Sequence, residues 1–143
     1  MKVAQTVAEL NDPESIPALA DSLGTGFVLH RTLAAFGEAA APAVVAVVTS
    51  PESTYDAVNE GLIALRFMVE DMATHPLSRA TLESIRLAAE QHLISPGRPA
   101  GTGTTLRWAI DLAVALNDRK LRGIVALLAS NPNEVMARGI TDP

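Results

Sequence analysis

The stretch "NDPESIPALADSLGTGFVLHRTLAAFG", Asn11 to Gly37, holds two short helical patterns separated by a tight turn. In its first half, apolar residues recur at helical spacing at Ile16, Leu19, Ala20 and Leu23. In its second half, the same spacing is carried by Val28, Leu29, Leu33 and Phe36. Asp12 or Ser15 can cap the first helix, while Gly24 and Gly37 end the two helices. The stretch therefore predicts two amphipathic helices joined by a short turn.

The same periodicity extends over the rest of the chain, and the period-two alternation typical of strands is nearly absent. Further helices are expected near residues 2–10, 39–48, 53–72, 78–94, 105–117 and 121–129, with a weak one at 134–140. The long helix 53–72 directs one apolar stripe inward, formed by Val58, Gly61, Leu62, Leu65, Met68, Val69 and Met72. Ser78 is expected to cap the helix that follows it. The predicted fold class is all-α.

Parts of this pattern repeat along the chain. The tripeptide "LND" occurs at Leu10–Asp12 and again at Leu116–Asp118, and a similar helix follows each copy. The segment "VVTSPESTYDAV", Val47 to Val58, also resembles "LLASNPNEVMA", Leu127 to Ala137. Three units between the two copies would each have a period of about 35 residues, which is typical of helix-pair repeats.

At this point the chain resembles the HEAT-repeat family. Asn11 to Gly37 is similar to that family's first helix, turn and second helix, with a proline early in the first helix. The resemblance implies a single domain, 1–143, that forms a right-handed α-solenoid of about three and a half repeats. These units would span about 11–37, 38–74, 76–117 and, in part, 118–143. The third unit departs from the pattern because it lacks the proline and has an enlarged loop.

The two ends of the chain carry apolar residues at helical spacing. These are Val3, Val7 and Leu10 at one end and Val135, Met136 and Ile140 at the other. An end repeat has only one neighbour to cover such a stripe, and terminal repeats usually carry polar caps. The chain is therefore expected either to self-associate through an end or to be a piece of a longer solenoid.

Composition excludes several classes of function. Hydrophobic residues make up 48% of the chain but aromatic residues only 3%, and cysteine is absent. Disulfides, thiolate metal sites and a cysteine nucleophile are thereby excluded. Residues 1–75 hold three basic against ten acidic side chains, a net −7, whereas residues 76–143 hold eight against six, a net +2. Because a nucleic-acid binder needs a concentrated basic face, this distribution argues against nucleic acid as a partner.

Targeting signals are not apparent in the sequence. The amino-terminal stretch is amphipathic and acidic, unlike a signal peptide. The longest apolar stretch, "AAAPAVVAVV", has about half of the length that a bilayer crossing requires. The expected protein is soluble and cytoplasmic, with no membrane association.

The stretch "SPGRPAGTGTT", Ser95 to Thr105, has the glycine content of a phosphate-binding loop. A Walker-type loop follows a strand and carries a lysine after its last glycine, and neither feature is present here. Ser95 to Thr104 is therefore expected to be a loop between helices that binds no nucleotide.

The sequence also gives little support for a catalytic or metal-binding site. His30, His75 and His92 have no partner ligand at i+3 or i+4, so no metal site is expected. Glu70, Asp71 and His75 form a compact acid–base group, but neighbouring side chains on a helix diverge and Arg66 can neutralise Glu70. No catalytic residue, cofactor or metal is therefore assigned, and no enzyme activity is expected.

The remaining candidate for a functional site is a binding surface. Aligning the second helices by Phe36, Leu65 and Leu116 places Arg31, Glu60 and Asp111 in one row and Asp56 beside Arg107. The candidate binding surface comprises Arg31, Asp56, Glu60, Ile63, Arg66, Phe67, Arg107, Trp108 and Asp111.

The resemblance implies that stacked second helices line a concave surface that binds another macromolecule. The expected function is a non-catalytic protein–protein interaction or scaffold module. The alternative is a HEAT-like enzyme or ligand carrier, similar to the bilin lyases or the DNA-repair glycosylases built on such repeats.

Overall fold

The computed structural model describes residues 12–25, 29–94 and 102–130. Within these ranges every regular element is helical, which confirms the all-α prediction. The α-helices are α2 (Ile16–Asp21), α3 (His30–Phe36), α4 (Ala41–Thr49), α5 (Tyr55–Glu70), α6 (Arg79–Ile94), α7 (Thr102–Leu116) and α8 (Arg119–Ala129). Short 3-10 helices at Pro13–Ser15 and Gly37–Ala39 precede α2 and α4.

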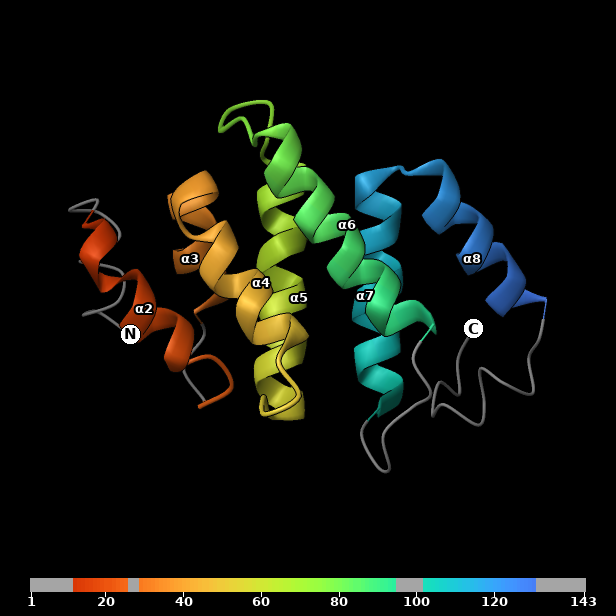
Figure 1. Cartoon of the computed structure of the whole chain (residues 1–143), viewed down its shortest axis with the longest axis horizontal. Helices are drawn as coiled ribbons and strands as arrows, with labels where there is room; N and C mark the ends of the chain where they lie inside the picture. Colours follow the sequence, from red (N-terminus) through yellow and green to blue (C-terminus); the bar gives the residue numbers. More distant parts are fainter. Residues whose placement is uncertain (1–11, 26–28, 95–101, 131–143) are drawn as a thin grey trace.

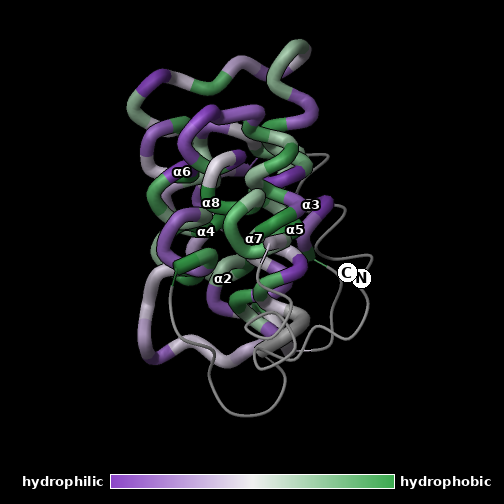
Figure 2. The backbone as a smooth tube through the Cα atoms, turned by 90° about the vertical axis from the view of Figure 1, so that its right-hand side faces the viewer, coloured by the Kyte–Doolittle hydropathy of each residue, from purple (hydrophilic) through white to green (hydrophobic). Residues whose placement is uncertain are grey.

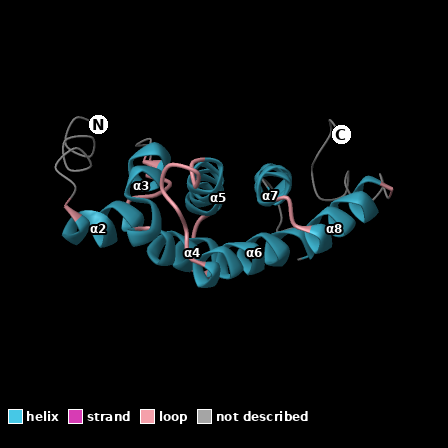
Figure 3. Ribbon diagram, turned by 90° about the horizontal axis from the view of Figure 1, so that it is seen from above, coloured by secondary structure: helices cyan, strands magenta, loops and turns pink. Residues whose placement is uncertain are grey.

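The helices alternate between two rows along the longest axis (Figure 1). One row contains α2, α4, α6 and α8, and the other contains α3, α5 and α7 (Figure 3). Neighbours within a row pack on each other, as α4 does on α6 and α5 on α7. Viewed from above, the first row curves around the side on which α3, α5 and α7 lie (Figure 3).

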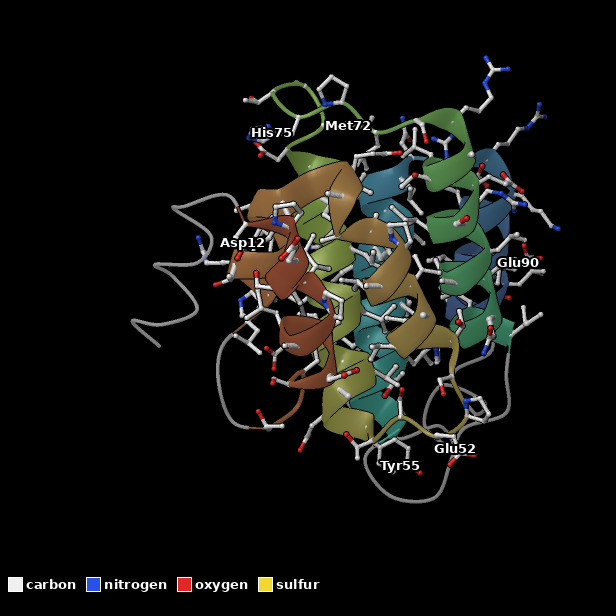
Figure 4. The ribbon with its side chains drawn as sticks, turned by 60° about the vertical axis from the view of Figure 1, so that its left-hand side comes forward. Asp12, Glu52, Tyr55, Met72, His75 and Glu90 are labelled. Atoms are coloured by element: carbon white, nitrogen blue, oxygen red, sulfur yellow. The ribbon has the colours of Figure 1, made fainter. Side chains whose placement is uncertain are left out.

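The core lies between the rows and is centred on α5. Seen along the long axis, much of the hydrophobic chain lies where the rows meet (Figure 2). Val58, Gly61, Leu62, Leu65, Met68 and Val69 are all buried, as predicted. The prediction for Met72 is wrong: α5 ends at Glu70, and Met72 is 42% exposed in the turn that follows (Figure 4).

Polar side chains mark several helix starts. Asp12 accepts a hydrogen bond from the Glu14 N–H at 3.1 Å, whereas Ser15 makes no such bond, so Asp12 is the cap of the two alternatives. Asp118 accepts from the Leu121 N–H at 2.9 Å, so the aspartates of both "LND" copies cap helices. Ser78 accepts from the Thr81 N–H at 3.1 Å, as predicted. Such caps satisfy first-turn N–H groups that have no partner within the helix.

One helix boundary differs clearly from the prediction. α7 begins at Thr102, about one turn before the expected start at Thr105, and includes Gly103. A glycine is unfavourable in the middle of a helix because its backbone loses more conformational freedom than that of other residues, and Gly103 lies in the first turn of α7 rather than in its middle. The rest of the predicted loop, the predicted helices 2–10 and 134–140, and the apolar residues at both ends lie outside the described residues.

The helices are short. The longest, α5 and α6, have 16 residues each. Within the described ranges, no single helix is both long and apolar enough to cross a bilayer. One pair of consecutive helical segments, His30–Ala39 and Ala41–Thr49, is together long and apolar enough by length and composition alone, and the chain bends by 119° between the two segments.

Candidate binding face

The ring of Phe67, on α5, is surrounded by three cationic or titratable groups. The His30 ring from α3 stacks on it with the centroids 5.5 Å apart and the planes inclined by 16°. The guanidinium carbons of Arg31 and Arg66 lie 5.0 and 5.2 Å from the ring centroid. Contacts of this kind between arginine and an aromatic face are attractive. They explain why an aromatic side chain is accommodated on the polar side of α5.

Arg66 connects α5 to α7. Its Nε lies 3.1 Å from Glu70 Oε1, which confirms the predicted pair within α5. Its Nη1 lies 3.5 Å from Asp111 Oδ2 on α7. The Arg66 side chain is 28% exposed, so this pairing is partly screened by water and contributes little to stability. It does fix the orientation of the arginine beside Phe67.

An open hollow of about 410 Å³ lies beside Phe67, lined by Arg31, Ala34, Ala35, Phe67, Glu70 and Asp71. The alanines form a small apolar wall, and the charged residues stand around it. Glu70 is paired with Arg66, and Asp71 Oδ2 lies 3.6 Å from His75 Nε2 in the turn after α5 (Figure 4). Among the described residues, no carboxylate pairs with Arg31, which is exposed. Its guanidinium donors therefore face solvent at the edge of the hollow.

Glu60 has a structural role that the sequence did not predict. Its carboxylate accepts hydrogen bonds from the Leu29 N–H at 2.6 Å and the Gly24 N–H at 3.4 Å. It therefore ties Gly24, after α2, and Leu29, before α3, to α5. Gly24 lies so close to α5 that an added Cβ would be 2.4 Å from the Ala57 nitrogen.

In the predicted row of Arg31, Glu60 and Asp111, the placement of Asp111 beside Glu60 is wrong. The Arg31 guanidinium lies over Phe67, about two turns further along α5 than Glu60. However, the Leu29 N–H, two residues before Arg31, binds the Glu60 carboxylate, so α3 begins at the level of Glu60. Asp111 lies against Arg66, while Thr105, near the start of α7, donates to Asn59 at 2.6 Å. By the same register, Arg107 lies about one and a half turns beyond Asp56. The alignment by Phe36, Leu65 and Leu116 failed for α7 because Leu116 is the last residue of α7, whereas Leu65 lies about one and a half turns before the end of α5.

The remaining predicted residues are more dispersed. Arg107 is exposed, and its guanidinium carbon lies 5.8 Å from the Trp108 ring centroid. Trp108 is half-buried and packs against the core. Asp56 is exposed and Ile63 is half-buried on α5. The structure thus brings together Arg31, Arg66, Phe67 and Asp111 and leaves the others at the margins of this group.

Burial lowers the pKa of His30 below its usual value. The nearby positive charges of Arg31 and Arg66 lower this pKa further, and the Glu60 carboxylate opposes the shift. His30 is therefore neutral at physiological pH, and its stacking on Phe67 is a contact between two uncharged rings.

The sequence alone does not assign His30, Ala34 or Ala35 to this face. It also gives Glu70 and Asp71 no role in binding. The i and i+4 spacings reveal Arg66–Glu70 and Asp71–His75, but they contain no information on which turn of α3 meets which turn of α5. Only the packing of these two helices places His30 on Phe67.

In the part of the chain that the structure describes, no three histidine or acidic side chains gather in a group that could hold a metal ion. Comparison of the chain with protein-family models, curated proteins and solved structures finds no match.

Proposed function

We propose that this protein is a non-catalytic protein–protein interaction module, built as a HEAT-like α-solenoid, that binds its partner on the α3–α5–α7 row. The observation that carries the proposal is the open hollow beside Phe67. It combines a small apolar wall, an aromatic ring and an arginine without a carboxylate partner among the described residues. Aromatic and arginine side chains are enriched at the centres of protein interfaces.

The charges of this face favour a protein over a nucleic acid. Three cations, Arg31, Arg66 and Arg107, stand among five carboxylates, those of Asp56, Glu60, Glu70, Asp71 and Asp111. A phosphate backbone would meet net repulsion there. This balance disfavours the glycosylase-like alternative, which would need a basic groove.

An enzyme or ligand carrier on the same scaffold is less well supported. Such a site would enclose two or more ionisable side chains, since catalytic groups work in water-excluded surroundings. The hollow beside Phe67 is open, and its two carboxylates are engaged by Arg66 and His75.

The test uses the tagged chain as bait for a partner from its native cells, followed by affinity measurement with both purified proteins. We expect Phe67→Ala and Arg31→Glu to weaken binding by at least about tenfold, since the anchor residues of an interface each contribute about 2 kcal/mol or more and tenfold corresponds to about 1.4 kcal/mol. The matched control is Leu87→Ala, which removes an exposed apolar side chain from α6 in the other row. Circular dichroism verifies that all variants fold.

The proposal would be wrong if the control weakened binding and the two hollow variants did not. It would also fail if the native cells yielded no protein partner while a small molecule bound the hollow, an outcome that would favour the ligand carrier.

A further inference from the structure

α8 stands at one end of its row and carries a basic face directed away from its neighbour. Lys120 Nζ lies 2.9 Å from Glu90 Oε1 on α6, which marks the side of α8 that faces α6 (Figure 4 shows Glu90). At about 100° per residue, Arg122 and Ala129 lie on the opposite side of α8, with Arg119 and Ala126 beside them. All four are exposed. Neither arginine pairs with a carboxylate among the described residues.

α2 stands at the opposite end of the same row (Figure 1) and carries an acidic face. Pro17, Ala18 and Asp21 are exposed on the side of α2 away from the buried Ile16 and Ala20, and Glu14 is exposed in the 3-10 helix that leads into α2. Residues 12–25 contain three acidic side chains and no basic one. Glu14 and Asp21 form no ion pair with any described residue.

We propose that two copies of this chain associate head to tail, with the acidic α2 face of one copy docked on the basic α8 face of the next. Charge complementarity identifies the partner, because Glu14 and Asp21 would meet Arg119 and Arg122. Ala18 lies between Glu14 and Asp21, and Ala126 and Ala129 follow the two arginines along the same side of α8. These short side chains permit two helices to approach closely. The contact adds a fifth helix beside α8 and so continues the row formed by α2, α4, α6 and α8 (Figure 3).

A contact between two different faces leaves one free face on each of the two outer copies, so further copies can add. The copies form a ring if the rotation from one to the next returns to the first copy, and otherwise an open chain. Since exposed charges carry the attraction, the association weakens as salt shortens the screening distance. This surface is separate from the hollow beside Phe67, so the partner-binding proposal and this one stand or fall independently.

The experiment is sedimentation velocity on the purified full chain over a concentration series, at about 20 mM and about 500 mM salt. We expect the weight-average sedimentation coefficient to rise with concentration at low salt and to do so much less at high salt. Arg119→Glu with Arg122→Glu should weaken association by about tenfold or more, and so should Glu14→Arg with Asp21→Arg. An equimolar mixture of these two double variants should associate again, because each acidic face then meets a basic one.

The control is Arg79→Glu with Arg107→Glu, which changes the same total charge at exposed positions on α6 and α7. This variant should associate as the unaltered chain does, apart from the effect of its net charge. A strict monomer at about millimolar concentration and low salt would overturn the proposal. Association that resists both salt and the two charge reversals would overturn it too, as would a mixture of correctly folded variants that stays monomeric.

Discussion

Gly24 lies in the turn after α2, in a backbone conformation and a space that only glycine satisfies. Its φ is +82°, in the left-handed region, and a Cβ there would lie 2.4 Å from the Ala57 nitrogen and 2.8 Å from its Cα. These atoms are backbone at the start of α5 and cannot turn aside. The close approach lets Glu60 reach the N–H groups of Gly24 and Leu29.

We expect Gly24→Ala to lower the free energy of unfolding by about 1–3 kcal/mol, through backbone strain and the clash with α5. Gly123→Ala is the matched control, since Gly123 lies within α8 with open space around it. Alanine is the better helix former, so the control should stabilise the protein by about 0.5–1 kcal/mol. Urea unfolding followed by circular dichroism compares the two. Equal effects of the two substitutions would contradict the role of Gly24.

His30 makes the stability of the Phe67 cluster depend on pH. Because its pKa is lower in the folded chain than its ordinary value of 6.5, the unfolded chain binds the proton more tightly. Stability from this residue is therefore complete above about pH 6.5 and is lost as pH falls through the lowered pKa.

His30→Phe provides the measurement, since it keeps a ring on Phe67 without a titrating group. We expect the unfolding midpoint of the unaltered chain to fall more steeply below about pH 6.5 than that of the variant. The ring protons of His30, followed by NMR, should report a pKa below 6.5. Parallel pH profiles for the two proteins would show that His30 does not carry the effect.

At the scale of elements, α5 packs on α3, α4 and α7, and Gly61 lies where α4 comes close to it. A Cβ at Gly61 would lie 2.6 Å from Val48 Cγ2. Val48 is buried and β-branched, so its side chain has few alternative rotamers. The absent side chain therefore sets how near α4 comes to α5, in a core that contains few aromatic residues to fill a wider gap.

We expect Gly61→Ala to destabilise the protein by about 1–2 kcal/mol, because overpacking of about 1–3 kcal/mol exceeds the gain in helix propensity. Val48→Ala should relieve the clash. A double-mutant cycle from urea unfolding should therefore give a coupling of at least about 0.5 kcal/mol, with Val48→Ala less harmful beside Gly61→Ala than alone. Additive effects would mean that α4 and α5 move apart freely.

At the scale of the whole molecule, the helices contact mainly their neighbours along the rows. α5 packs on α3, α4 and α7, whereas α8 packs chiefly on α6 and α7 at one end. Where elements contact mainly their neighbours, stability is approximately the sum of local units and the interfaces between them. An end helix can therefore open while the middle stays folded.

Substitutions at two fully buried leucines, Leu121 in α8 and Leu62 in α5, test whether an end helix opens separately from the middle. Replacement of either by alanine should cost about 2–5 kcal/mol. In native-state hydrogen exchange, we expect Leu121→Ala to reduce protection in α8 and leave that of α5 nearly unchanged. Leu62→Ala should reduce protection in α3, α4, α5 and α7 together. Uniform loss of protection in both variants would mean that the chain unfolds as one unit.

The sequence by itself determined which segments are helical and which faces they bury. Apolar spacing placed the buried stripe of α5, and local polar residues marked the caps at Asp12, Ser78 and Asp118. These features depend on neighbours within a few positions, and helix formation follows local propensity and capping. The misplaced Met72 and the late start predicted for α7 are errors of about one turn at helix ends, where local signals are weakest.

Only the tertiary structure decided which turn of one helix meets which turn of the next. Asp111 reaches Arg66 rather than the level of Glu60, and the Arg31 side chain reaches Phe67 although α3 begins at the level of Glu60. Close contacts at Gly24–Ala57 and Gly61–Val48 set how near Gly24 and α4 come to α5. Such a register depends on side-chain volumes that meet across more than ten positions of sequence, and periodicity within one helix contains no information about it. The hollow beside Phe67 and the opposed charges of α2 and α8 exist only once that register is set.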